Sequence, residues 1–285
     1  MNRILVLGRY GMLGHVVYET LTAHSEFMVV GCARKALDSN TEAVDVSNFG
    51  DVEGLILKIR PDVVINCVGV LISDSDESPG NAILLNSYLP HKLADLGRQH
   101  SFKLIQISTD CVFSGSRGNY RIEDSCDGDT IYARTKALGE VIGDGNLTIR
   151  TSIIGPELKT NGTGLMDWYL KQDGEINGYS GVYWSGVTTL ELAKALIEFI
   201  KQDITGLYQF TVEPKISKFD LLRLFQQVWT RGDVVIRKQS NYVCDKSMLN
   251  TRKDFSWDMS NYGEMVYELK RWVDDRPKEY AHYQK

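Results

Sequence analysis

A tyrosine and a lysine stand four residues apart in the segment "IYARTKALGE", residues 131–140. If this segment is a helix, Tyr132 and Lys136 lie on the same face, because four residues make about one turn. Tyrosine has a reference pKa of about 10 and transfers protons poorly at neutral pH unless a neighbouring cation stabilises its phenolate. A lysine one turn away supplies that charge, and the pair suits the protonation of a carbonyl oxygen during a reduction. The same spacing is common on surface helices, so the pair means little alone.

Two hydroxyl side chains precede this pair in "QISTDCVFSG", directly after the apolar run that ends at Ile107. In a doubly wound sheet, ligands bind beyond the carboxyl ends of the strands, which is where Ser108 and Thr109 would lie. A threonine hydroxyl there can bind a substrate carbonyl oxygen and stabilise the developing oxyanion. We therefore predict a catalytic group of Thr109, Tyr132 and Lys136, with Ser108 able to share the hydroxyl role.

A glycine-rich turn follows the first apolar run, where "LGRYGMLGHV" places Gly8, Gly11 and Gly14 with GxxGxxG spacing. Between a strand and a helix, such glycines allow a tight turn, a close approach to a pyrophosphate and close helix packing. The helix N-terminus adds free N–H groups for the phosphates. This segment predicts a dinucleotide site.

The residues after the second apolar run bear on which dinucleotide is bound. NAD-binding proteins place a carboxylate near this position to bind the ribose 2′-hydroxyl, but "GCARKALD" has Cys32 there, followed by Arg34 and Lys35. A cation suits the 2′-phosphate of NADP, so we expect NADPH with some use of NADH. Both basic residues could instead be solvated, and Asp45 could contact adenine or serve as a turn residue.

Strand-like and helix-like segments alternate through the first 155 residues, which predicts a doubly wound parallel Rossmann sheet of the α/β class. After "GPELKTNGTG" the rhythm changes, so we expect domain 1–155 to bind the dinucleotide, with later segments able to return to it, and 156–285 to form a smaller mixed α/β substrate lobe. We expect strands at 3–7, 27–31, 62–67, 103–107, 147–151, 207–211 and 234–237, and helices at 12–23, 48–59, 80–99, 131–143, 164–172, 188–201, 217–229 and 260–275. Ser217 and Ser260 are the expected N-caps of the last two helices.

The composition argues against several classes of function. The 285 residues carry a net charge of −5 without a lysine- or arginine-rich block, which argues against a general nucleic-acid or membrane-surface binder. Five cysteines without a CxxC pair and five scattered histidines predict reduced thiols, no metal site and a cytoplasmic protein. No apolar run has the length of a membrane span.

Together, "GRYGMLG", "STDCVF", "YARTKALGE" and "IRTSIIG" resemble the extended short-chain dehydrogenases/reductases, and within them the dTDP-4-dehydrorhamnose reductase family. The resemblance is specific over residues 1–155 and looser beyond. It implies NAD(P)H-dependent reduction of the 4-keto group of a dTDP- or UDP-linked 6-deoxyhexose, in the synthesis of surface polysaccharide precursors. A homodimer is possible by analogy only.

The same resemblance implies roles for individual residues. Arg34 would meet the 2′-phosphate, Asp45 and Val46 would lie near adenine, and Asn86 would lie near the catalytic lysine. The cofactor-binding residues implied are Gly8, Tyr10, Gly11, Met12, Leu13, Gly14, Arg34, Asp45, Val46, Cys67, Val68, Gly69, Asn86, Tyr132 and Lys136.

Departures from the family pattern concern the substrate side. Ile153 stands where an aromatic residue is usual, Cys111 replaces the usual tyrosine after Asp110, and Trp184 is a candidate substitute aromatic, although a tryptophan more often packs in a core. A cation is needed for the substrate phosphates, and Arg252 is the candidate. The expected substrate-binding residues are Asp110, Ile153, Trp184 and Arg252.

Two other functions remain open. The fold family includes a non-catalytic NADP-binding regulatory subunit of methionine adenosyltransferase, which lost catalytic residues would favour. The superfamily also contains nucleotide-sugar epimerases and dehydratases; the latter usually have an acidic pair after the hydroxyl, and "STDC" has Asp110 alone.

Overall fold

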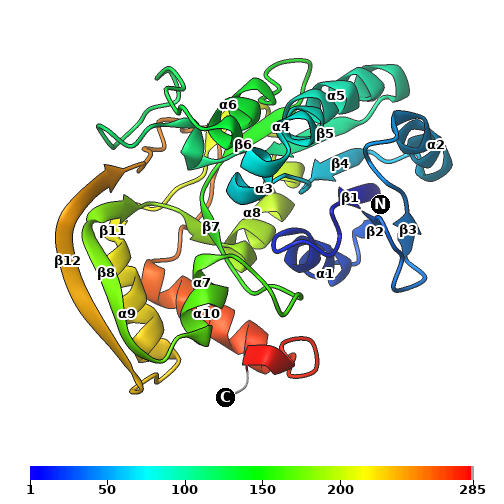
Figure 1. The fold of residues 1–285 in the computed structure, drawn as a ribbon. Helices are drawn as coiled ribbons and strands as arrows, with labels where there is room; N and C mark the ends of the chain where they lie inside the picture. The colour runs from blue at the N-terminus through cyan, green and yellow to red at the C-terminus, as the bar shows by residue number, and fades with distance from the viewer. Residues whose placement is uncertain (284–285) are drawn as a thin grey trace.

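The computed structural model describes residues 1–283, and its centre is a seven-stranded parallel sheet in the order β10-β6-β5-β4-β1-β2-β3 (Figure 1). This doubly wound arrangement confirms the predicted α/β class. The strands are β1 (Asn2–Leu7), β2 (Phe27–Ala33), β3 (Thr41–Ala43), β4 (Val63–Asn66), β5 (Lys103–Ile107), β6 (Leu147–Arg150) and β10 (Gly206–Gln209).

The central strands are continuous apolar runs because helices cover both faces of the sheet. In β1, Ile4 and Val6 pack into one hydrophobic cluster, whereas Leu5 and Leu7 pack into another on the opposite face. The helices of the sheet are α1 (Gly14–Thr22), α2 (Phe49–Ile59), α5 (Leu89–His100), α6 (Ile131–Leu138) and α8 (Thr189–Lys201).

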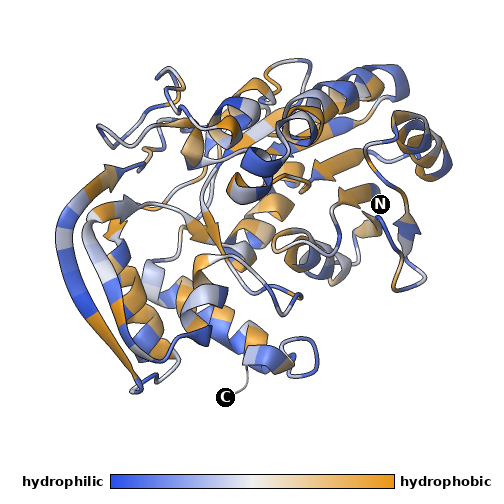
Figure 2. Cartoon of the chain, viewed as in Figure 1, coloured by the Kyte–Doolittle hydropathy of each residue, from blue (hydrophilic) through white to orange (hydrophobic). Residues whose placement is uncertain are grey.

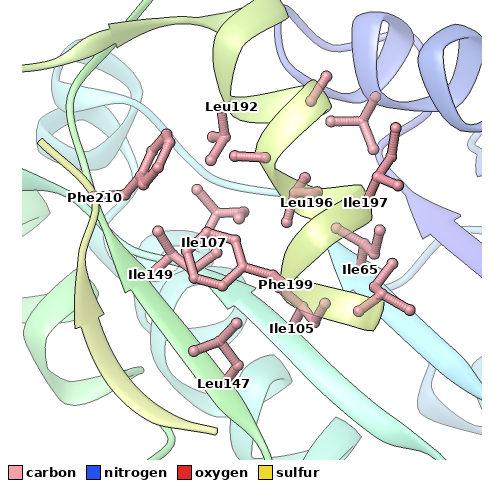
Figure 3. Close-up of a cluster of buried hydrophobic side chains, with 14 of the residues drawn as sticks. Ile65, Ile105, Ile107, Leu147, Ile149, Leu192, Leu196, Ile197, Phe199 and Phe210 are labelled. Atoms are coloured by element: carbon pink, nitrogen blue, oxygen red, sulfur yellow. The ribbon is translucent and has the colours of Figure 1, made fainter. Parts of the chain in front are cut away.

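Helix α8 covers the centre of one face, although it lies late in the chain. Leu192, Leu196 and Phe199 pack in one cluster with Ile65 and Ile105 of the central strands (Figure 3). Helix α1 contributes to the same cluster, and α2 and α5 contribute to the cluster on the opposite face. The segment therefore completes the core of the dinucleotide-binding sheet.

A smaller lobe contains the three-stranded sheet β11-β8-β12 and three helices. The long strands β8 and β12 pair in parallel and curve around α9, and hydrophilic residues occupy the middle of β12 (Figures 1 and 2). The lobe elements are α7 (Leu165–Lys171), β8 (Gly174–Trp184), β11 (Ile216–Ser217), α9 (Lys218–Val228), β12 (Val234–Asp245) and α10 (Tyr262–Asp274).

Short elements connect these parts. They are α3 (Ile72–Glu77), α4 (Pro79–Ala82), the π-helix η1 (Ile83–Tyr88), the 3₁₀ helices η2 (Asp110–Val112) and η3 (Ala281–Tyr283), and the paired strands β7 (Ile153–Ile154) and β9 (Val187–Thr188). Within residues 1–283, no helix combines the length and apolarity needed to cross a bilayer.

The structure corrects several expectations. Strands β3 and β8 were not predicted, and β12 is longer than the expected 234–237. Ser217 is confirmed as the cap of α9, but the cap of α10 is Asn261 rather than Ser260, because Asn261 and Glu264 form a reciprocal capping box. Elements α8 and β10 follow residue 155 in the chain but belong to the first sheet, which the expectation of returning segments allowed.

Candidate active site

The glycine loop is a tight turn between β1 and α1. Gly8 has φ +80°, a conformation that favours glycine, and a methyl group at residue 14 would lie 2.1 Å from the Gly8 carbonyl oxygen. No side chain caps the N-terminus of α1. Its first N–H groups are therefore available to a phosphate, and the loop fits a dinucleotide pyrophosphate.

The adenosine end of this loop holds charges of both signs. The Tyr10 hydroxyl donates to Asp38 Oδ2 over 3.0 Å and accepts from the backbone N–H of Leu37. The guanidinium of Arg9 lies 3.8 Å from the ring centroid of Tyr18, and its buried Nε has no partner among the described residues. Arg9 and Asp38 were missed by the sequence interpretation, although Arg9 directly follows Gly8.

Arg34 and Asp45 lie close enough to interact, since Arg34 contributes to the lowered pKa of the Asp45 carboxyl. The larger contributions come from Ser47, whose backbone N–H and hydroxyl donate to Asp45 Oδ1 over 3.0 and 2.7 Å. Asp45 is thus a turn residue, as one of the two interpretations expected, and Val46 beside it is buried. Adenine contact by either residue stays a prediction.

Strand β4 brings its carboxyl end against the glycine loop. A methyl group on Gly8 would lie 3.1 Å from the carbonyl carbon of Cys67 and 3.2 Å from Val68 Cγ2. The side chain of Asn86, in η1, is fully buried and bonded: its oxygen accepts from the N–H of Val70, and its nitrogen donates to the Val70 carbonyl and the Thr135 hydroxyl. Asn86 therefore joins the loop after β4 to α6, next to Lys136.

Helix α6 begins where the Thr130 side chain accepts a hydrogen bond from the N–H of Ala133. The helix carries Lys136 to the sheet, where Nζ donates to the carbonyl oxygen of Ile107 over 2.6 Å. Burial lowers the pKa of Lys136 to about 8, and the nearby Glu140 and Cys67 oppose this shift. The ammonium therefore lies at the carboxyl edge of β5, where the nucleotide site was expected.

Tyr132 lies on the same helix face and interacts with the Thr109 hydroxyl. Burial raises the pKa of its phenol, Cys111 and Asp110 raise it further, and the bond with Thr109 lowers it. The phenol therefore holds its proton at neutral pH, which is the form that a proton donor requires. Lys136 is not among the groups that shift this pKa. Its ammonium donates to Ile107 instead.

The Ser108 hydroxyl interacts with Glu140. It donates to Glu140 Oε1 over 2.7 Å, and Glu140 forms a buried ion pair with Arg150. The Ser108 hydroxyl is therefore engaged with Glu140, whereas the Thr109 hydroxyl is the one that interacts with Tyr132. The sequence could not distinguish the two, because neighbouring residues differ only in which way each side chain points.

Asp110 lies at the substrate side with two cations from the other lobe. Burial raises the pKa of its carboxyl, which Lys218 and Lys246 oppose. Lys218 is the first residue of α9, and its Nζ lies 5.3 Å from the ring centroid of Trp184. Lys246 follows β12 and interacts with the Cys111 thiol, whose pKa burial raises to about 12. Lys218 was missed, because its position depends on how the lobes meet.

Trp184 and Arg252 do not fit their expected roles. Trp184 is 2% exposed within the core of the small lobe, so its ring cannot stack on a sugar. Arg252 donates from Nη1 to the carbonyl oxygens of Thr205 and Leu207, beside the amino end of β10. That is the sheet edge opposite Thr109. Ile153, in β7, packs partly buried against the main core.

The chain is similar to several known proteins. A family model described as the RmlD substrate binding domain matches residues 1–239. A dTDP-4-dehydrorhamnose reductase of Aggregatibacter actinomycetemcomitans is 28% identical over 77% of this chain and 76% of its own length. The methionine adenosyltransferase 2 subunit beta of Xenopus laevis is 32% identical over 49% of this chain and 42% of its own.

Solved structures agree with the fold. A hypothetical dTDP-4-dehydrorhamnose reductase from Sulfolobus tokodaii superposes with a TM-score of 0.75 at 25% identity, covering 86% of this chain and 91% of that one. A dTDP-4-dehydrorhamnose reductase from Bacillus anthracis, in complex with NADP, has a TM-score of 0.81 at 20% identity over 96% and 100% of the chains. Because the family match spans most of the sequence, the chain belongs to the RmlD substrate binding domain family, in agreement with the resemblance of its motifs.

Proposed function

We propose that this protein reduces the 4-keto group of a dTDP- or UDP-linked 6-deoxyhexose with NADPH. The observation that carries the proposal is the group of Thr109, Tyr132 and Lys136 at the same sheet edge as the glycine loop. Relatives named as reductases of dTDP-linked keto sugars, such as dTDP-4-keto-6-deoxy-D-glucose reductase from Streptomyces niveus, support the substrate class.

Each side chain has a distinct task in this proposal. NADPH supplies the hydride when it is bound. Tyr132 is protonated at neutral pH and donates a proton to the carbonyl oxygen, and the Thr109 hydroxyl binds that oxygen as negative charge develops. Lys136 has two protons beyond the one donated to Ile107, and these can hold the cofactor ribose.

The adenosine end supports NADPH while allowing NADH. Arg34 and Arg9 favour the 2′-phosphate, whereas the carboxylate of Asp38 favours a free ribose hydroxyl. We therefore expect both cofactors to bind, NADPH more tightly. Fluorescence titration of the purified protein with each cofactor measures this order.

The substrate anion is assigned to Lys218 and Lys246. Two ammonium groups face one carboxylate, that of Asp110, and the Cys111 thiol is neutral because its pKa is about 12. The excess positive charge suits an anionic group of the substrate, such as its diphosphate. This assignment replaces Arg252.

Substitution of the proton donor tests the function. In the Tyr132→Phe variant, NADPH oxidation with a panel of nucleotide 4-keto sugars should fall by about 10²–10⁴-fold while NADPH affinity is retained. Undiminished turnover in Tyr132→Phe would refute the proton donor.

The charge of Lys136 gives a second test. Because the pKa of Lys136 is about 8, wild-type turnover should decline as pH rises through that value and the ammonium loses its charge.

The cofactor balance separates this reaction from its alternatives. A reductase consumes NADPH in proportion to product, whereas an epimerase or dehydratase regenerates its cofactor. A regulatory subunit would bind NADP without turnover on any sugar. Homodimerisation stays a prediction by analogy, and light scattering after size-exclusion chromatography measures it.

A further inference from the structure

A buried histidine connects the glycine loop to the C-terminal segment. His15, in the first turn of α1, is fully buried and carries no role in the proposed reaction. Its Nδ1 lies 2.8 Å from the carbonyl oxygen of Gly11, and its Nε2 lies 2.7 Å from the hydroxyl oxygen of Tyr280. The indole Nε1 of Trp272, in α10, lies 3.0 Å from the same hydroxyl oxygen.

The direction of each hydrogen bond follows from the chemistry of its atoms. A carbonyl oxygen only accepts, so Nδ1 carries the proton and donates to Gly11. Burial lowers the pKa of His15, so the ring is neutral and Nε2 accepts from the Tyr280 hydroxyl. An indole N–H only donates, so Trp272 donates to the Tyr280 oxygen. The three bonds run from Trp272 to Gly11 with every donor matched to one acceptor.

The loop end of this chain of bonds fixes the orientation of a peptide group. A phosphate cradle requires N–H groups directed at the ligand and carbonyl oxygens directed away from it. Gly11 is exposed and is the middle glycine of the loop, and it has no side chain that could restrain its peptide group. The Nδ1–H of His15 binds the Gly11 oxygen, which also accepts the backbone N–H of His15 over 3.2 Å.

We propose that His15, Tyr280 and Trp272 are positioning residues for the dinucleotide: they hold the Gly11 carbonyl turned away from the phosphates. The proposal rests on the dinucleotide site of the proposed function but not on the sugar or the reaction. It also assigns the C-terminal segment a part in cofactor affinity, although that segment lies outside the predicted dinucleotide domain.

Substitution of Tyr280 tests the proposal directly. Tyr280→Phe keeps the ring and leaves Nε2 of His15 without its donor, so the dissociation constant for NADPH should rise by about three- to tenfold. The matched control is Tyr283→Phe, because the Tyr283 hydroxyl binds Asp167 Oδ1 and the N–H of Glu157, not the loop. The control should bind NADPH as the wild type does.

Two substitutions of His15 separate a positioning role from simple packing. Asparagine can place its amide nitrogen near the position of Nδ1 and keep the bond to Gly11, whereas glutamine reaches only toward Tyr280. We expect His15→Asn to bind NADPH more tightly than His15→Gln at similar melting temperatures. Equal affinities in these two variants, or equal losses in Tyr280→Phe and Tyr283→Phe, would overturn the proposal.

The readout is the binding of NADPH to the full-length protein, measured by fluorescence, with no sugar present. Wild-type protein that binds NADPH but reduces no sugar would contradict the proposed reaction and leave this test intact. Wild-type affinity in Tyr280→Phe would contradict only the positioning role.

Discussion

Lys218 and Lys246 come from different elements of the small lobe, and both lie beside Asp110, next to the proposed catalytic threonine. A lysine at the first position of a helix is unfavourable, because the helix dipole is positive there. Burial also lowers the pKa of Lys218, which shows that its charge is held at a cost. An anionic substrate group would offset both effects at Lys218, which is consistent with the proposed substrate role of this lysine.

Replacing either lysine should affect substrate affinity. In Lys218→Met or Lys246→Met, the KM for the nucleotide sugar should rise about tenfold or more, because a charge-assisted hydrogen bond is lost. Lys238→Met is the matched control, since that lysine is exposed on β12. Steady-state kinetics at saturating NADPH gives the values. If KM rises in Lys238→Met but not in Lys218→Met or Lys246→Met, the lysine pair does not bind the substrate.

Single residues were predictable where the chemistry is local. Tyr132 and Lys136 share a helix face, and Thr109 follows a strand, so their spacing within a strand-and-helix pattern predicted that they would lie at one edge of the sheet. Arg252 does not fit its predicted place beside the substrate phosphates, because its chain segment runs back along β10 to the opposite sheet edge. Ser108 does not fit a shared hydroxyl role with Thr109, because its hydroxyl donates to Glu140. These outcomes depend on side-chain direction and tertiary packing, which spacing does not encode.

At the scale of elements, the π-helix η1 positions a polar side chain beside the site, as α6 does. Residues 83–88 lie between α4 and α5 with hydrogen bonds that span one more residue than in an α-helix, and Asn86 is fully buried within them. That geometry directs its amide onto Val70 and Thr135. An isolated polar residue in an apolar run suggested that Asn86 was special, but not that it connects two elements of the site.

The glycine loop and α2 offer a matched pair of substitutions. Gly14→Ala would place a methyl group 2.1 Å from the Gly8 oxygen, so it should destabilise the fold by about 1–3 kcal/mol and remove NADPH binding. Gly54, exposed in α2, has open space, so Gly54→Ala should stabilise by about 0.5–1 kcal/mol. Thermal unfolding and NADPH titration measure both. Tight NADPH binding by Gly14→Ala would contradict the loop geometry.

The order of strands and helices in the first half was predictable because buried parallel strands have an unmistakable composition. The small lobe was less so: β8 contains three glycines and several polar residues, which weakens its strand signal. Strand β3 has only three residues. Their pairing, and the return of β10 to the main sheet, depend on long-range contacts.

At the scale of the whole molecule, the two parts of the chain share one core. Helix α8 and strand β10 come after residue 155, yet they complete one face and one edge of the main sheet. Removing them would expose Ile65, Ile105 and Ile107, which are buried against α8 (Figure 3). The first 155 residues therefore do not contain the whole core of the main sheet.

A truncated chain tests this dependence. The fragment 1–155 should fail to fold cooperatively and should aggregate, because a large apolar face would be exposed to water. Circular dichroism and thermal melting of the fragment, beside the full-length protein, provide the comparison. A soluble fragment with a cooperative transition and NADPH binding would show that the boundary at 155 is a real domain boundary.

The hydrogen bond between His15 and Tyr280 joins residues 265 positions apart. During synthesis, at roughly 5–20 residues per second, Tyr280 is added roughly 15 to 50 s after His15 of the first helix. The nascent chain can form β1 and α1 early, but the Gly11 peptide acquires its full restraint only when the C-terminal segment arrives. If the proposed positioning role holds, a chain interrupted before residue 280 binds the nucleotide more weakly than the finished protein, however well its first sheet has formed.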